Sequence, residues 1–265
     1  MNSSEAGRRS RGEIDEADIT GFASLGKVEL VSLLHSKTAT DRSYAAILLG
    51  NFQDSDTVTQ LCRQLSIEKK LYTRIAICKS LVKCADLSIP LLIELLGRIG
   101  KNQEDKIPET GFYKTSYPLP RDIAARTICR LGNTAIGPLE NFIETSADTP
   151  AIAQALDAYG HIVYTNQTQR SPASLQRLYI NQPTHDFLKY KIARCLSGFH
   201  DDWSRSFLFS LLRTGSIGHQ LEALRSLLLS GAEIPLDVER SFTGELRKLN
   251  IFFKHKLTNR STRSR

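Results

Sequence analysis

Apolar residues recur along most of this chain with the period of an α-helix. Typical stripes are Val58, Leu61 and Leu65, and then Ile89, Leu92 and Leu96. Positions i, i+3 and i+7 lie on one face of an α-helix. No segment alternates apolar and polar residues over the length of a strand. The pattern therefore predicts an all-α chain with essentially no sheet.

A second pattern precedes these stripes and repeats along the chain. A basic residue is followed by two small or apolar residues, and then by an apolar residue, usually Leu. The first copy holds Arg42, Ala45, Ala46, Leu49 and Gly50. The first small position recurs at residues 45, 77, 124, 155, 192 and 223. Small residues let helices approach closely, and helical hairpins that bury a face only against their neighbours stack into a solenoid. We therefore predict an α-solenoid of about six helical hairpins with capping helices, over residues 20–257.

These residues resemble HEAT repeats, in particular the short bacterial type found in phycobilisome-lyase-like proteins. The resemblance is good over residues 41–52, 121–132 and 89–96, and it is weaker in the later copies. It implies a solenoid whose second helices line a concave surface. It implies no particular chemistry, because members of this family mostly hold other molecules. Some attach bilins to phycobiliproteins, and one distant HEAT-like branch excises alkylated DNA bases.

One interval of the repeat is longer than the others, and the excess is an inserted loop at residues 101–120. The insert begins polar and becomes aromatic at Phe112, Tyr113 and Tyr117. Insertions in repeat proteins form loops on one face, which is often the binding face, and aromatic residues are typical of contact surfaces. The alternative interpretation is that these rings only pack the loop onto the solenoid.

The net charge of +7 belongs to the end of the chain. Residues 240–265 hold eight basic residues and one acidic residue, so the remainder of the 35 basic and 28 acidic residues is balanced. The basic segment includes Arg247, Lys248, Lys254 and Lys256. Its apolar positions follow helical spacing at Phe242, Leu246, Leu249 and Phe253. This pattern favours a capping helix, and a basic helix that docks on nucleic acid or an anionic surface is the alternative.

The two ends of the chain are expected to lie outside the solenoid. Residues 1–19 mix Ser, Gly, Arg and Glu and predict a disordered lead, and residues 258–265 predict a basic disordered tail. No apolar run is long enough for a transmembrane span, and the first residues form no secretory signal. Five cysteines without paired spacing favour a reducing compartment, so we expect a cytoplasmic protein.

No catalytic or metal-binding motif stands out. The His and Cys residues show no zinc spacing, and the chain has no Gly-rich phosphate loop. The densest polar cluster, residues 200–203, suits the N-cap of a helix. A pairing of Asp201 and Trp203 around a DNA base is the less favoured alternative. We therefore expect no catalytic residue, no metal and no cofactor.

The sequence as a whole favours a non-enzymatic scaffold or adaptor that binds a protein partner. The expected partner-binding residues are Arg63 and Arg98 on second helices and Phe112, Tyr113 and Tyr117 on the insert. One alternative is a nucleic-acid-binding protein, with or without base excision. The polar positions of the second helices alternate in sign, however, whereas a groove that follows phosphates is uniformly basic. The other alternative is a lyase or chaperone subunit for a tetrapyrrole protein, which rests only on the repeat subtype.

Overall fold

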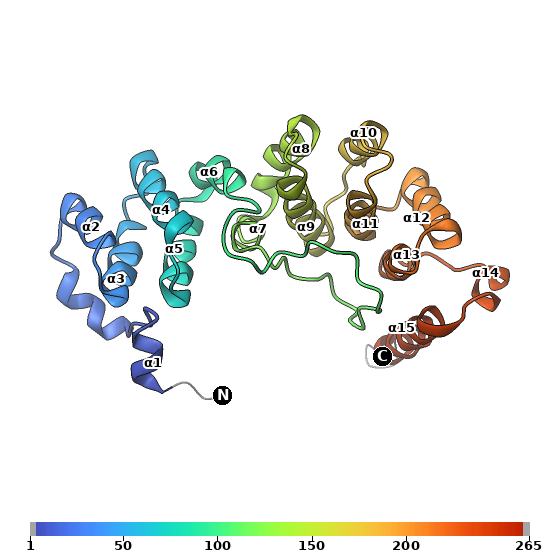
Figure 1. Cartoon of the computed structure of the whole chain (residues 1–265), viewed down its shortest axis with the longest axis horizontal. Helices are drawn as coiled ribbons and strands as arrows, with labels where there is room; N and C mark the ends of the chain where they lie inside the picture. The colour runs from blue at the N-terminus through green and yellow to red at the C-terminus, as the bar shows by residue number, and fades with distance from the viewer. Residues whose placement is uncertain (1–3, 262–265) are drawn as a thin grey trace. The chain divides into compact units, whose positions relative to one another are not determined.

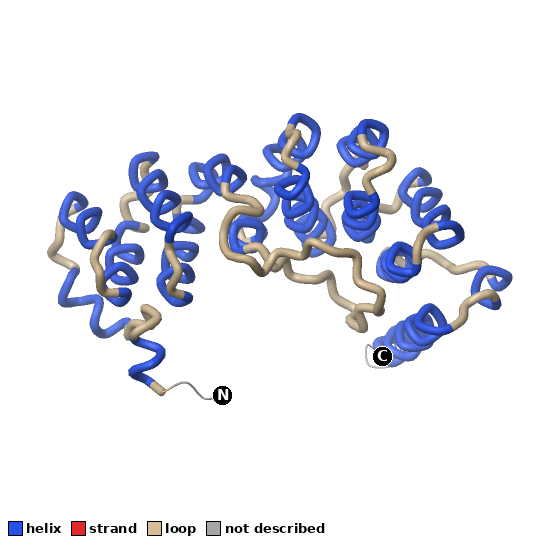
Figure 2. Tube along the Cα trace, viewed as in Figure 1, coloured by secondary structure: helices blue, strands red, loops and turns tan. Residues whose placement is uncertain are grey.

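A computed structural model describes residues 4–261 of the chain. Within this range the backbone forms helices, turns and loops and no strand, so the all-α prediction is confirmed (Figure 2). The chain divides into two units. Unit 1 comprises Met1–Gln103 and Arg121–Pro138, and unit 2 comprises Glu104–Pro120 and Leu139–Arg265.

The helices of unit 1 pack as pairs. In chain order they are α1 (Glu5–Arg9), η1 (Glu16–Phe22), α2 (Lys27–Leu34), α3 (Ala39–Leu49), α4 (Ser55–Ile67), α5 (Leu71–Lys83), η2 (Ala85–Ser88), α6 (Ile89–Glu94), α7 (Ile123–Cys129) and η3 (Gly132–Ala135). Helix α5 packs against α3 and α7 within one layer, and against α4 of a second layer (Figure 1). Helix α8 (Ile136–Thr145) begins in unit 1 and continues into unit 2.

Unit 2 repeats this arrangement. Its helices are α9 (Thr149–Thr165), α10 (Ala173–Asn181), α11 (Asp186–Cys195), η4 (Leu196–Gly198), α12 (Asp202–Thr214), α13 (Ile217–Leu229), α14 (Leu236–Arg240) and α15 (Gly244–Ser261). Helix α11 packs between α9 and α13, and α13 also contacts α12 and α15. We call α3, α5, α7, α9, α11 and α13 the first helices, and α4, α6, α8, α10 and α12 the second helices.

The repeated small residues allow the first helices to approach one another. Ala45 and Ala46 of α3 are fully buried, as are Ala124 and Ala125 of α7. At Gly50 an added Cβ would lie 2.7 Å from the Cβ of Ser80, so α3 and α5 meet there backbone to side chain. Close packing between neighbouring first helices is therefore encoded by side-chain size, as the repeat pattern predicts.

The prediction of a disordered lead is wrong for the residues that the structure describes. Residues 4–22 form α1 and η1 and lie against α3 and α5 of unit 1. The Ser43 hydroxyl donates to the carbonyl oxygen of Gly12 at 2.7 Å, and the amide of Tyr72 donates to the carbonyl oxygen of Arg11 at 3.0 Å. Backbone contacts of this kind, which have no hydropathy signature, order a polar segment.

The prediction for the C-terminal tail is also wrong in its boundary. Helix α15 continues to Ser261, beyond residue 257, where we expected the helix to end. Residues 262–265 lie outside the described range. Across residues 4–261, none of the helices combines the length and the apolar character that a bilayer crossing requires.

Candidate functional site

The insert is the most unusual feature of unit 2. Residues 104–120 contain no helix and lie along the first-helix layer, over α9, α11, α13 and the following α15 (Figure 1). Irregular backbone can cover a helix layer only if its polar groups find partners there. Five charged side chains of the first helices supply much of this bonding, and we call them the charged bed: Asp157, Lys191, Arg194, Glu222 and Arg225.

Glu104 fixes the start of the insert to α11. Its carboxylate accepts from Lys191 Nζ at 2.8 Å and from Arg194 Nη1 at 2.6 Å. Lys191 also donates to Asp157 Oδ2 at 2.6 Å, so one buried ammonium joins the insert to α9. Arg194 additionally bonds the hydroxyl of Tyr190. The side chains of Lys191, Arg194 and Asp157 are all buried, which makes these charge-assisted bonds strong but also makes them interdependent.

Arg225 of α13 binds the C-terminal half of the insert. Its guanidinium donates to Glu222 Oε1 at 2.9 Å and to the carbonyl oxygen of Ser116 at 2.7 Å. The same guanidinium lies 5.0 Å from the centroid of the Phe112 ring, within the range of a cation–π contact. A single arginine therefore contacts two points of the insert.

The charges of the bed stabilise one another's ionised forms. Burial alone would raise the pKa of Glu104, but the neighbouring Arg194 and Lys191 lower that pKa to about 2. Burial would likewise raise the pKa of Glu222, and Arg194 and Arg225 hold it below its ordinary value. Both carboxylates are therefore ionised at neutral pH, and each is neutralised by a cation of the bed.

Two helical glycines shape the seat of the insert. A Cβ at Gly218 of α13 would lie 2.3 Å from Ile107 Cγ2 and 2.5 Å from the carbonyl oxygen of Pro108. A Cβ at Gly160 of α9 would lie 2.1 Å from the hydroxyl of Tyr117. Any larger residue at either position would push the insert away from its helix.

The three aromatic residues of the insert differ in exposure. Phe112 and Tyr113 are 36% and 38% exposed, whereas Tyr117 is only 5% exposed. Tyr117 packs against the rings of His161 and Tyr164 and belongs to the core of unit 2. Its assignment as a partner-binding residue is therefore corrected, and the alternative that the ring packs the loop holds for Tyr117. Tyr113 donates its hydroxyl to Glu245 at 2.7 Å while keeping part of its ring at the surface.

The expected contact surface also needs correction. Arg63 of α4 and Arg98, which follows α6, are exposed, but both belong to unit 1, whereas Phe112 and Tyr113 belong to unit 2. Within unit 2 the insert lies on the first helices rather than on the second helices that we expected to share a face with it. The five expected residues are therefore divided between the two units, and Tyr117 among them is buried.

Helix α15 has a buried apolar face and exposed basic residues. Leu249 and Phe253 are fully buried, and Phe242 and Leu246 are nearly so, while the helix packs against α13. Arg247, Lys248, Lys254 and Lys256 are all exposed. Lys248 pairs with Glu245 at 2.8 Å, and Lys254 pairs with Glu239. The apolar face of this helix thus has the capping role that its spacing predicts.

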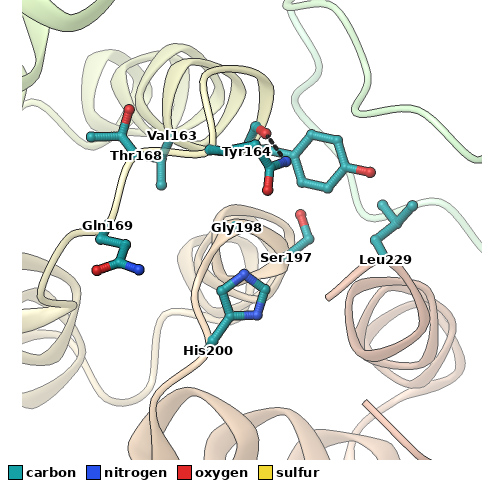
Figure 3. A pocket seen from close by; sticks show the side chains of 9 residues that line it. Val163, Tyr164, Thr168, Gln169, Ser197, Gly198, His200 and Leu229 are labelled. Atoms are coloured by element: carbon teal, nitrogen blue, oxygen red, sulfur yellow. Dashed lines mark hydrogen bonds between the residues drawn. The ribbon is translucent and has the colours of Figure 1, made fainter. Parts of the chain in front are cut away.

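The polar cluster at residues 200–203 caps a helix. Asp201 accepts from the amide of Ser204 at 3.0 Å at the start of α12, and Trp203 stacks on Phe207. His200 instead borders a small pocket of about 160 Å³, with Val163, Ser197 and Leu229 around it (Figure 3). One imidazole beside aliphatic and hydroxyl groups provides a polar contact but no acid–base pair.

The arrangement of metal-ligating side chains and the burial of the thiols bear on possible chemistry. Within residues 4–261, no three His, Cys, Asp or Glu side chains are grouped closely enough to hold a metal ion. Burial raises the pKa of Cys195 well above its ordinary value and raises that of Cys62 to about 12. These thiols are protonated at neutral pH, as structural cysteines are.

Sequence reasoning missed the charged bed. The sequence does contain a sign of these charges. Asp157 lies between Leu156 and Ala158, and Lys191 lies between Tyr190 and Ile192, so both interrupt apolar helix positions. A charge among buried helix positions needs a partner of opposite sign. The partner of Lys191 that comes from the insert lies 87 residues away in sequence, so no local pattern identifies it.

Comparisons with known proteins add no assignment. No protein-family model matches the chain, and no curated protein matches it either.

Proposed function

We propose that this protein is a non-enzymatic protein-binding scaffold or adaptor built from HEAT-like helical hairpins. The repeated pairing of first and second helices and the recurring small residues support the repeat interpretation. The proposed contact surface in unit 2 is the exposed part of the insert, centred on Phe112 and Tyr113.

One observation carries this proposal: the insert is anchored along its length while two of its aromatic rings stay partly exposed. Glu104 and Ser116 are held by the charged bed, and Tyr117 is buried. Phe112 and Tyr113 lie between these anchors. An aromatic group that is already ordered loses little conformational entropy on binding, so it suits an interface.

The bonding of the charged bed favours binding over catalysis. Lys191, Arg194 and Arg225 each form an ion pair with a carboxylate of the same unit. A catalytic acid or base must instead reach a proton on the substrate. The bed is therefore best explained as the support of the insert.

The test is quantitative affinity purification with the full chain as bait. We expect Phe112→Ala combined with Tyr113→Ala to lower the recovery of specific partners about tenfold, as loss of aromatic anchors does at other interfaces. Phe52→Ala is the matched control, because Phe52 is an exposed aromatic residue of unit 1. Unchanged partners for the double variant, with unchanged thermal stability, would contradict the proposed role of the insert.

Nucleic-acid binding is the competing outcome, supported by the exposed basic residues of α15. It predicts a gel shift that weakens steeply with salt and is lost when Arg247 and Lys256 are changed to Glu. Such a result, with no effect of the Phe112 and Tyr113 changes, would replace the scaffold proposal.

A further inference from the structure

Helices α5 and α7 of unit 1 expose a stripe that no motif in the sequence singles out. On α5 the exposed residues are Leu71, Ile75, Lys79 and Lys83, each four positions after the last. Arg130, just after α7, is exposed as well. Residues four apart lie on one face of a helix, so the α5 residues form a continuous line with an apolar start and a basic end.

The apolar part of this stripe consists of two partly exposed aliphatic side chains. Leu71 is 50% exposed and Ile75 is 39% exposed. The other sides of α5 are covered by α3, α4 and α7, so the line faces away from the second-helix layer. Two neighbouring aliphatic side chains left in water at the edge of charged groups resemble the centre of a binding surface rather than a solvated helix face.

Arg130 lies beside α5 and extends the basic end of the stripe. Burial raises the pKa of Cys78 of α5, and the nearby Arg130 is one of the groups that oppose this rise. Cys78 directly precedes Lys79, and α5 packs against α7. The positive charges of Lys79 and Arg130 therefore come from adjacent helices of one layer.

The stripe carries charge of one sign. Neither α5 nor α7 contains an acidic residue. The acids nearest in sequence to the two helices are Glu68, Asp86 and Asp122. Glu68 is buried and pairs with Arg42, and Asp122 is buried at the start of α7, where its carboxylate accepts from backbone amides. Asp86 in η2, just after α5, is exposed. Outside residues 240–265 the positive and negative charges of the chain balance, yet this part of unit 1 carries a local excess of positive charge. Such an excess favours an anionic ligand.

The rest of the first-helix surface indicates what kind of anionic ligand fits. In unit 1 the lead places the carboxylate of Asp18 on the hydroxyl of Tyr44 at 2.9 Å. In unit 2 the insert places the carboxylate of Glu104 on Lys191 and Arg194. In both units, first helices already hold segments from outside the repeats that carry carboxylates.

We propose that Leu71, Ile75, Lys79 and Arg130 form a docking surface for an acidic segment of a partner protein. Aliphatic side chains of the segment would pack on Leu71 and Ile75, and its carboxylates would pair with Lys79 and Arg130. This inference rests on the proposed scaffold function and adds the chemistry of a second contact surface. The aliphatic pair separates this ligand from nucleic acid, whose backbone offers phosphates but no aliphatic groups.

The experiment is a fluorescence anisotropy titration of the full chain with a labelled synthetic peptide of Glu and Leu residues. Its sequence differs from that of the lead, which already occupies its own contacts on α3 and α5. We expect Lys79→Glu combined with Arg130→Glu to weaken binding at least about tenfold, and Leu71→Ser combined with Ile75→Ser to weaken it about fivefold. Arg63→Glu, which reverses an exposed charge of α4 in the second-helix layer, should change the affinity less than about twofold.

A single-stranded oligonucleotide serves as the second probe. If it binds, depends on Lys79 and Arg130 but not on Leu71 and Ile75, and the peptide does not bind, the stripe is a nucleic-acid surface and the proposal is overturned. Absence of any peptide binding overturns it as well, and so does peptide binding that does not change when any of the four residues is substituted. Either failure leaves the Phe112 and Tyr113 experiment unaffected, so the scaffold function and this surface are tested separately. All four side chains are exposed, and thermal unfolding of each variant should match the unmodified chain.

Discussion

The lead on unit 1 and the insert on unit 2 must both be held against first helices, and they are held by different kinds of bonds. Each segment lies against first helices at a glycine contact, through Gly12 in the lead and Gly218 of α13 under the insert. The lead is held by hydrogen bonds from hydroxyl groups of α3, those of Ser43 and Tyr44, whereas the insert is held by buried ion pairs. First helices can therefore order a segment with or without buried ion pairs.

The two kinds of attachment differ in how much stabilising free energy is lost when one bonding partner is removed. A neutral hydrogen bond such as that from Ser43 to Gly12 contributes about 1 kcal/mol. Removal of one member of a buried ion network leaves other charges unpaired in a dry environment, which costs several times more. The insert should therefore be held more cooperatively than the lead, and four predictions test this difference in order of expected size.

The largest effect is expected at Arg194. Arg194→Met leaves Glu104, Asp157 and Glu222 with too few cations, so we expect the free energy of unfolding of unit 2 to fall by about 3–5 kcal/mol. Urea denaturation followed by fluorescence of Trp203, the single tryptophan, measures it in unit 2. Arg177→Met is the matched control, because the pair of Arg177 with Glu144 lies at the surface, where solvent screens it, and its loss should leave the unfolding curve nearly unchanged.

The second effect is a pH dependence that belongs to the insert. The pKa of Glu104 is about 2 in the folded chain, against an ordinary value of 4.5. A depressed pKa stabilises the fold above the unfolded value, and this stability is lost as pH falls from about 4.5 to about 2. The shift corresponds to about 3 kcal/mol for unit 2.

Glu104→Gln tests this assignment. The variant should be less stable than the unmodified chain at pH 7 and should show a shallower loss of stability between pH 4.5 and pH 2, because it lacks the titrating carboxylate. The same urea titration at several pH values measures both quantities. Parallel pH profiles for the two proteins would show that Glu104 does not anchor the insert.

The third effect is the release of one segment at a time when alanine replaces the glycine that it contacts. A Cβ at Gly12 would lie 2.2 Å from Thr73 Oγ1, and its φ of +90° disfavours other residues. We expect Gly12→Ala to cost at least about 1–2 kcal/mol locally and to release the lead, and Gly218→Ala to release the insert. Limited trypsin digestion should then cut at Arg11 in the first variant and at Lys106 in the second.

Matched controls exist for both glycines. No atom lies within 4 Å of a Cβ built at Gly21 or Gly137, so alanine there should leave the digestion pattern unchanged. Cleavage of both segments by either variant would show that lead and insert are coupled, which would contradict the independent attachment inferred from their separate contacts.

The smallest effect concerns two tyrosine hydroxyls that bond carboxylates. Tyr44 donates to Asp18 of the lead at 2.9 Å, and Tyr113 of the insert donates to Glu245 at 2.7 Å. Tyr44→Phe should cost about 1 kcal/mol, whereas Tyr113→Phe, at a more exposed site, should cost about 0.5 kcal/mol or less. Amide hydrogen exchange of residues 12–22 and 104–120 measures each loss. A larger effect at Tyr113 would reverse the expected order.

Local regularities made much of the fold predictable. The i, i+3, i+7 stripes correspond to α4, α6 and α8, and Asp54 and Asp122 cap helices by accepting backbone amides. The buried apolar face of α15 also follows from its spacing. These features depend on residues within one or two helical turns, so sequence alone reveals them.

The candidate site was only partly predictable. The insert was recognisable by its length and its aromatic residues, but Tyr117 is buried while Phe112 and Tyr113 are not. Arg63 and Arg98 turned out to belong to the other unit. Which face an irregular segment covers depends on contacts between residues far apart in sequence, and periodicity carries no information about them.

The sequence by itself determined that this protein is helical, where its first and second helices lie, and that small residues permit their close packing. Only the tertiary structure decided that residues 4–22 form helices on α3 and α5, that the insert covers the first helices of unit 2, and that α5 packs against α7. Helix formation follows from neighbouring residues, whereas the pairing of Glu104 with Lys191 and Arg194 requires the chain to be folded.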